Sequence, residues 1–313
     1  MSDPRAEFVA RIDLSKTRVR SFEGFVLLCG GALSKDPAPI KSVRHMIYGE
    51  LTSGRHSKIA TRLKMAEEIQ DWFQAGAYSD LVTFEEHLAG LSDVIVLIVE
   101  SAGAVAELGV FSVSQAFSAK LLIVIAEHHY ELDSFIKLGP LKRLENIDAQ
   151  SVLVYDWHED NPGGRVEKYE KLTTELGEIA DSINSYLDEA SSERNFKKAE
   201  PAHTMFLICE LCDLFGALAE TEISAYLGKA GLNITGNELG QYLFMLLRCD
   251  FLKVKSKGHG RYYYAPDWTS RISFGYHPGI QINKDRVRVD VIAHYEENLK
   301  SRFTVVQSIR KQM

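Results

Sequence analysis

One segment, residues 92–109, limits more than any other what this chain can fold into. Val94 to Val99 holds five β-branched residues and one leucine, which suits a parallel strand covered on both faces. Small residues from Ser101 to Ala104 end the strand, and we predict a helix with Glu107 in its first turn. Because ligands of open α/β sheets bind beyond the carboxyl ends of such strands, the segment predicts an acid at a ligand site.

Strands and helices alternate over the first two thirds of the chain. Besides residues 93–99, the apolar runs indicate strands at residues 23–29, 121–125 and 152–155. Helical spacing or helix-start signals occur at residues 56–75, 83–91, 104–118 and 165–190. Thr83 and Glu86 match a capping box, and residues 161–164 indicate a turn. The alternation predicts an α/β fold with a mostly parallel, flavodoxin/Rossmann-like sheet and helices on both faces.

A polar run at residues 191–201 is predicted to be a linker between two domains. Beyond it, three short helices are predicted at residues 203–215, from 221 to an end between 228 and 231, and at 237–249. A hairpin with glycines at its tip follows at residues 251–265, and a final helix at residues 289–311. This is the order of a winged helix-turn-helix. We therefore predict one domain over residues 1–192 and a winged-helix domain over residues 202–313.

The charge is divided unevenly along the chain. The net charge is −7, yet residues 201–313 carry 14 Lys/Arg against 11 Asp/Glu. An acidic first part and a mildly basic second part suggest two tasks, although the basic excess is too small to indicate nucleic acid by itself. With 45% hydrophobic and 25% charged residues in a chain of 313, two globular domains are expected.

The sequence favours a reducing compartment. The chain has no apolar run long enough for a bilayer, and Met1 to Arg5 lacks a signal-peptide core. Cys209 and Cys212 form a CxxC inside an apolar run, without a second pair at zinc spacing. This favours buried helix thiols over a metal or redox site. We expect a cytoplasmic protein with no metal and no cofactor.

Residues at the predicted ligand edge have both functional and structural interpretations. Glu107 is either a nucleophile kept ionised by the helix dipole or a side chain that merely complements that dipole. Residues 29–31, after the first strand, either bring backbone amides to a phosphate or form a simple turn. Arg44 either pairs with a phosphate or lies on the surface. Ser101 and Gly103 are small enough for a ligand to approach the backbone.

Three strings resemble the nucleoside deoxyribosyltransferase-like superfamily, and most closely the effector proteins of type II retrons. They are Ser92-Asp93-Val94-Ile95-Val96-Leu97, Glu100-Ser101-Ala102-Gly103 and Glu107-Leu108-Gly109. Further strings that look like these effectors are Cys29-Gly30-Gly31, Ser42-Val43-Arg44-His45, Gly139-Pro140 and Ser151-Val152-Leu153. Such effectors combine a deoxyribosyltransferase-like domain with a winged-helix module. The resemblance covers residues 22–156 by motif and residues 203–268 by architecture alone.

The resemblance implies roles for individual residues. Glu107 would attack the anomeric carbon of a nucleoside, and Glu85, eight positions before Asp93, would protonate the leaving base. Paired carboxylates suit cleavage of a glycosidic bond. At position 85 a Glu replaces the usual Asp, and neighbouring Glu86 competes for the role. Substrate contacts are expected from Cys29, Gly30, Gly31, Arg44, Ser101 and Gly103. Ser101 replaces a family Asp, which indicates a changed sugar or a phosphorylated substrate.

The predicted hairpin carries basic and aromatic residues. Lys253, Lys255, Lys257 and Arg261 suit contacts with a phosphate backbone. Three tyrosines follow at residues 262–264; such rings stack on unpaired bases, although strand alternation turns at least one into the core. The third helix is poor in basic residues, so major-groove reading is not expected. Nucleic-acid contact and protein contact both remain open. The resemblance implies the retron reverse transcriptase and its RNA-linked single-stranded DNA (msDNA) as partner, and a homodimer.

The leading hypothesis is therefore a toxic effector held inactive by the reverse transcriptase–msDNA complex. It would act as an N-glycosidase on a nucleotide, with NAD+ favoured and purine nucleotides next. One alternative is a deoxyribosyltransferase that exchanges bases between deoxynucleosides. Another is a DNA-binding regulator that senses a nucleotide without turnover.

Overall fold

The computed structural model of this protein describes residues 3–20, 24–34, 36–69, 75–189, 193–267 and 269–311. The chain divides into two compact units. The sheet unit comprises residues 23–70 and 88–191, and the helical unit comprises residues 1–22, 71–87 and 192–313. These units are interleaved in sequence, whereas the predicted domains are contiguous. None of the helices in the described ranges is long and apolar enough to cross a membrane.

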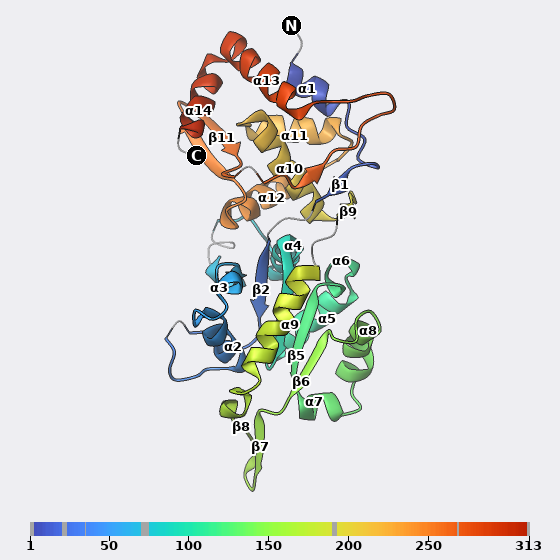
Figure 1. Cartoon of the computed structure of the whole chain (residues 1–313), viewed down its shortest axis with the longest axis vertical. Coiled ribbons are helices and arrows are strands. Elements are labelled where there is room, and N and C mark those ends of the chain that lie inside the picture. Colours follow the sequence, from blue (N-terminus) through green and yellow to red (C-terminus); the bar gives the residue numbers. More distant parts are fainter. Residues whose placement is uncertain are drawn as a thin grey trace. The chain divides into compact units, whose positions relative to one another are not determined.

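A five-stranded parallel sheet in the order β3-β2-β4-β5-β6 forms the centre of the sheet unit (Figure 1). The strands are β2 (Phe25–Cys29), β3 (Leu63–Lys64), β4 (Ser92–Val99), β5 (Leu121–Ala126) and β6 (Val152–Tyr155). This confirms the α/β fold and four predicted strands; Glu23, the predicted start of the first, lies outside the described residues. Counted along the sheet unit, the strand order is 2-1-3-4-5. That is the flavodoxin-like order, whose ligand-binding switch point falls between β2 and β4.

Helices cover both faces of this sheet. On one face, alternate residues of β2, β4 and β5 form a core with α2 (Val43–Thr52), α3 (Ser57–Ala60) and α9 (Leu176–Glu189), which crosses the strands in Figure 1. On the opposite face, α5 (Ala102–Val113) turns Leu108 and Phe111 inward. Because both faces are covered, every residue of β4 is buried, as the continuous apolar run predicts.

The other elements that include residues of the sheet unit are short. They are η1 (Ala66–Glu68), α4 (Leu81–Leu91, shared with the helical unit), α6 (Gln115–Ser118), α7 (Glu127–Glu131), η2 (Lys137–Leu141), α8 (Lys142–Glu145), β7 (His158–Asn161), β8 (Gly164–Glu167) and η3 (Tyr169–Leu172). The β7–β8 hairpin confirms the predicted turn at residues 161–164.

Several predicted helices need correction. Over residues 56–75 the structure has one helical turn, the edge strand β3 and a 3-10 turn, because Leu63 pairs with Val26 of β2; Trp72 and Phe73 lie outside the described residues. In the predicted helix 165–190, the start belongs to β8 and the helix begins only at Leu176. The predicted helix 104–118 is divided at Ser114, whose backbone is extended.

The predicted capping box of Thr83 and Glu86 is also wrong. The carboxylate of Asp80 accepts the backbone amide of Thr83 at 2.7 Å, and it accepts the Thr83 hydroxyl at 3.0 Å. Asp80 therefore caps α4, and Glu86 is exposed without that structural role.

The helical unit contains the three predicted helices followed by a hairpin. The helices are α10 (Pro201–Phe215), α11 (Glu220–Lys229) and α12 (Gly236–Arg248), and the hairpin strands are β10 (Lys253–Lys257) and β11 (Gly260–Tyr264). Leu218, between α10 and α11, forms an antiparallel bridge with Tyr263 of β11. The predicted final helix is two helices, α13 (Lys284–Asn298) and α14 (Lys300–Arg310).

The N-terminal residues belong to this unit. Helix α1 (Pro4–Val9) carries Arg5, which is buried in the helical unit. Arg5 donates to Glu222 at 2.7 Å and to Asp3 at 2.8 Å. Strand β1 (Arg18–Val19) pairs with β9 (Arg194–Asn195) and β12 (Ile272–Ser273). The linker prediction is therefore wrong at residues 194–195, which form a strand, while Ser191 and Ser192 lie outside the described residues.

Candidate functional site

Glu107 lies beyond the carboxyl end of β4 but not in the first turn of its helix. Helix α5 begins at Ala102, and the Ser101 hydroxyl caps it by accepting the amide of Ala104 at 3.2 Å. Counted from Ala102, Glu107 is the sixth helical residue, so the free amides of the helix start do not reach it. The predicted dipole stabilisation is wrong for this reason. Ser101 has a defined structural role as the cap.

The Glu107 carboxylate is largely shielded from water. Its side chain is half-buried, and its Oε2 atom is buried with no hydrogen-bond partner among the described residues. Burial raises the pKa of Glu107, the nearby positive charge of Arg44 opposes that rise, and the negative charge of Glu67 adds to it. A desolvated carboxylate of this kind is more basic than one in water, which is a property expected at catalytic sites.

Arg44 is a buried member of the same group of charges. It lies in the first turn of α2 with 2% of its side chain exposed, and its two terminal nitrogens donate to Glu67 at 2.6 and 2.9 Å. Burial alone would lower the pKa of Arg44, but the hydrogen bonds to Glu67 and the negative charges nearby together outweigh burial, and the pKa is raised. The surface interpretation of Arg44 is therefore wrong, and the terminal nitrogens that would grip a phosphate are occupied.

Glu100, at the end of β4, ties the neighbouring loops together. Its Oε1 atom accepts the amides of Gly31 at 2.9 Å and Arg44 at 3.0 Å, and its Oε2 atom accepts the amide of Val43 at 2.7 Å. Burial raises the pKa of Glu100 even though these three amides oppose the rise. Sequence reasoning gave Glu100 no role; the available signals were an acid at the end of one predicted strand and a glycine pair at the end of another.

The glycines after β2 provide space for that carboxylate. A Cβ atom on Gly31 would lie 2.8 Å from the Glu100 carboxyl carbon, and Gly30 has a φ of +147°. The amide of Gly31 donates to Glu100, so it is not directed at a phosphate in this structure. Cys29 is buried as the last residue of β2, and Gly103 is exposed in the first turn of α5.

The second predicted acid belongs to the other unit. Glu85 is half-buried on α4, in the part of that helix grouped with the helical unit, whereas Glu107 belongs to the sheet unit. The pairing of Glu85 with Glu107 therefore stays a prediction. Asp93 has a structural role, since it accepts the amide of Gly24 at 2.8 Å and a hydrogen bond from Arg62.

The hairpin separates its basic residues onto two faces. Lys253, Lys255 and Lys257 alternate along β10 and share one face, whereas Arg261 is paired with Ser256 on the other. Lys253, Lys257 and Arg261 are exposed and Lys255 is half-buried.

The tyrosine run confirms that one ring faces the core, because Tyr263 is 4% exposed. Tyr262 is covered instead by the Arg302 guanidinium, 4.3 Å from its ring centre. The ring of Tyr262 is therefore already stacked within the unit.

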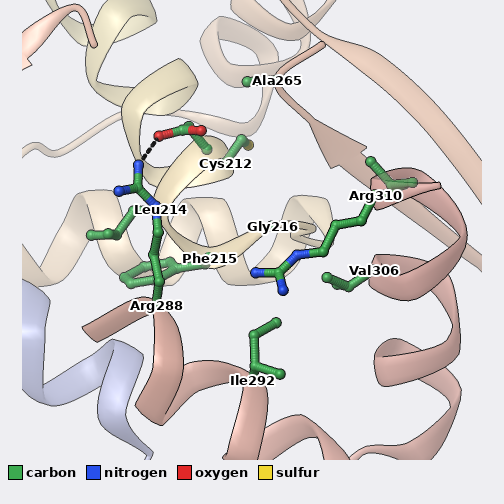
Figure 2. Close-up of a pocket in the computed structure, with 11 residues that line it drawn as sticks. Cys212, Leu214, Phe215, Gly216, Ala265, Arg288, Ile292, Val306 and Arg310 are labelled. Atoms are coloured by element: carbon green, nitrogen blue, oxygen red, sulfur yellow. Dashed lines mark hydrogen bonds and ion pairs between the residues drawn. The ribbon is translucent and has the colours of Figure 1, made fainter. Parts of the chain in front are cut away.

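A pocket in the helical unit contains none of the predicted site residues. It holds about 430 Å³, including the space at its mouth, and is lined by residues of α10, α13 and α14 together with Gly216 and Ala265. Figure 2 shows the ion pair of Arg288 with Asp213, at 2.5 Å, and Arg310 extending toward Gly216 and Ile292.

The cysteine pair has the predicted character. Cys209 and Cys212 are buried in α10 as free thiols. Burial raises the pKa of Cys209 to about 12, and it raises the pKa of Cys212 well above that of an ordinary thiol. Within the described ranges, no group of three or more His, Cys, Asp or Glu residues has the geometry to hold a metal ion.

Comparison with known proteins identifies the family. The model of the STM3845 retron effector protein family matches residues 40–254, more than half of the chain. The chain belongs to this retron effector family. The match includes Arg44, Glu100 and Glu107 of the sheet unit, as well as the three helices that precede the hairpin.

Two Escherichia coli proteins are similar over parts of their length. The retron Ec86 protein, named as a proposed ribosyltransferase/DNA-binding protein, is 33% identical over 129 residues, 41% of this chain and 39% of that protein. The retron Ec73 protein, named in the same way, is 27% identical over 180 residues, 56% of this chain and 54% of that protein. The matched regions thus span about half or less of these relatives.

Proposed function

We propose that this retron effector is an N-glycosidase in which Glu107 is the nucleophile. The observation that carries the proposal is the desolvated Glu107 carboxylate beyond the end of β4, with one buried oxygen that has no partner among the described residues. Its position beside the β2/β4 switch point is where a sheet of this order binds ligands. The proposed ribosyltransferase activity in the relatives' names supports the same chemistry.

The reaction divides into two displacements at the sugar carbon C1′. One oxygen of Glu107 bonds to C1′ while the C1′–N bond breaks and its electron pair leaves with the base. Water then attacks C1′, loses a proton to solvent and releases Glu107 as the carboxylate. Because burial raises the pKa of Glu107 and so its basicity, the first displacement gains driving force. The positive charge of Arg44 opposes this rise and so favours the ionised carboxylate that the attack requires.

NAD+ is the favoured substrate for a chemical reason. Its pyridinium nitrogen takes the electron pair and leaves as neutral nicotinamide, so no proton donor is required. A purine nucleotide needs protonation of the base, which is the role proposed for Glu85. Because the role of Glu85 as proton donor stays a prediction, the site suits NAD+ better, with nicotinamide and ADP-ribose as products.

The helical unit is proposed to be a winged-helix module. Its support is the order of α10, α11 and α12 followed by the hairpin, together with the Leu218–Tyr263 bridge that adds a third strand position to it. The lysine face of β10 would contact the retron reverse transcriptase–msDNA complex, which would hold the toxic effector inactive in the cytoplasm. A homodimer through the sheet unit belongs to the same proposal.

The test is expression in cells that lack the reverse transcriptase and msDNA. Wild-type protein should stop growth and deplete NAD+, and Glu107→Gln should do neither. Glu189→Gln, an exposed glutamate in the last turn of α9, should behave as wild type. Equal toxicity of the wild type and Glu107→Gln would remove the proposal. Wild-type toxicity with intact NAD+ would remove the substrate but leave the enzyme.

A further inference from the structure

Two buried atoms of opposite hydrogen-bonding character lack partners at the carboxyl edge of the sheet. Arg44 Nε can only donate a hydrogen bond, and an ionised Glu107 can only accept at Oε2. Both atoms are buried, and neither has a hydrogen-bond partner among the described residues. Leaving such groups unsatisfied costs free energy, so a pair of them indicates a ligand group that satisfies both.

The backbone brings these two side chains to the same loops. Arg44 follows β2 and Glu107 follows β4, the two strands on either side of the switch point. Glu100 binds the α2 amides of Val43 and Arg44 to the end of β4. The charges of Arg44 and Glu107 influence each other's titration, which agrees with their closeness.

The chemistry of the pair limits what can lie between them. A phosphate would be repelled by the carboxylate, and a cation would be repelled by the guanidinium. A hydroxyl group accepts one hydrogen bond and donates another, so it satisfies both atoms at once. In glycoside cleavage, hydrogen bonds to the hydroxyl beside the reacting carbon strengthen in the transition state.

We propose that Arg44 Nε and Glu107 Oε2 bind the 2′-hydroxyl of the substrate sugar, which makes the site specific for ribosides over 2′-deoxyribosides. This inference rests on the proposed function, since it places C1′ at the other oxygen of Glu107. One carboxylate oxygen then lies at C1′, and the other accepts a hydrogen bond from the hydroxyl on the neighbouring carbon of the same pentose. Ser101, which stands where the transferases carry an Asp, is already used as the α5 cap and so is not required for the sugar.

The test measures binding of two sugars that have no base to lose. Ribose 5-phosphate and 2-deoxyribose 5-phosphate are titrated into the full-length wild-type protein by calorimetry. The wild type should bind ribose 5-phosphate about tenfold or more tightly, the value of a charge-assisted hydrogen bond. Arg44→Lys should reduce the ratio toward one.

Arg62→Lys is the matched control. Arg62 is an arginine of the same unit that donates to the Asp93 carboxylate and to the Gly24 carbonyl, at the opposite end of the strands. It should keep the wild-type ratio. Thermal unfolding shows that each variant is folded.

Equal affinity of the wild type for the two sugars, or no binding of either, would overturn the inference without requiring any variant. A preference that persists in folded Arg44→Lys would also overturn it. Base release from NAD+ together with equal affinities for the two sugars would support the proposed glycosidase and exclude the hydroxyl site. A sugar preference without base release would leave the hydroxyl site and remove the glycosidase.

Discussion

The Glu67 carboxylate binds both terminal nitrogens of Arg44, at 2.6 and 2.9 Å, although 60% of the Glu67 side chain is exposed and only 2% of that of Arg44. A guanidinium this deep needs a counter-charge, because an unpaired buried charge is strongly destabilising. Glu67 supplies the counter-charge from the solvent side. Of the three side-chain nitrogens of Arg44, Nε is the one that is buried without a hydrogen-bond partner among the described residues.

Glu67→Gln should lower the free energy of unfolding by about 1 kcal/mol, below the loss for a fully buried pair, because water reaches the exposed carboxylate. Arg44 lowers the pKa of Glu67 from 4.5. The stabilisation is therefore complete above that value and lost as pH falls through the lowered pKa. Urea unfolding at pH 7 and pH 3 measures it. Asp188→Asn, which removes the exposed pair with Lys58, should change little; an equal loss would contradict the difference in burial.

The acidic limb of the pH–rate profile should lie above 4.5, the ordinary pKa of a glutamate, because burial raises the pKa of Glu107. The nucleophile must be ionised, so kcat/KM rises as pH rises through that pKa. Arg44→Met removes a charge that lowers the pKa and should move the limb to higher pH. Arg62→Met should leave it in place. Profiles of NAD+ cleavage that coincide for the wild type and Arg44→Met would exclude electrostatic control by Arg44.

Gly31→Ala should destabilise the sheet unit by about 1–3 kcal/mol. Its Cβ atom would lie 2.8 Å from the Glu100 carboxyl carbon, so the three amide hydrogen bonds to Glu100 would be disturbed. Gly49→Ala is the matched substitution: Gly49 lies in α2 with nothing within 4 Å of its Cβ position, and Ala should stabilise the helix by about 0.5–1 kcal/mol. The opposite signs can be read from urea midpoints.

Arg5→Ala should destabilise the helical unit by about 3 kcal/mol. It removes a positive charge that pairs with the largely buried Glu222 carboxylate, and it removes the cation over the Tyr295 ring. Arg11→Ala removes an exposed pair with Glu7 at 3.9 Å and should cost less than about 0.5 kcal/mol. Similar unfolding curves for the two variants would show that α1 contributes little to the unit.

Replacing Lys253, Lys255 and Lys257 with Ala should weaken binding to single-stranded DNA and reduce its salt dependence. Loss of three phosphate contacts lowers the slope of log affinity against log salt by about 2. Arg261→Ala, on the other face of the hairpin, should lower it by less than about 0.5 on the same scale. Fluorescence anisotropy at several salt concentrations measures both. If only Arg261→Ala changed the slope, the nucleic acid would lie on the opposite face.

Much of the sheet unit could be predicted locally. The runs that form β2, β4, β5 and β6 are apolar because each strand is covered on both faces, and that requirement is written in the strand's own residues. The β7–β8 turn is also determined locally, by the turn residues at 161–164. The segment 57–69 could not be predicted, because the pairing of Leu63 with Val26 overrides its helical spacing.

The sequence by itself determined the α/β class, the strands at the centre of the sheet and the placement of Glu107 beyond the end of one of them. The tertiary structure alone decided that Glu100 binds Gly31, that Glu67 neutralises Arg44, and that residues 1–22 belong with the C-terminal part of the chain. The physical reason is that apolar burial depends on the pattern within one element, whereas a charged side chain takes its partner from whichever distant element the fold brings beside it.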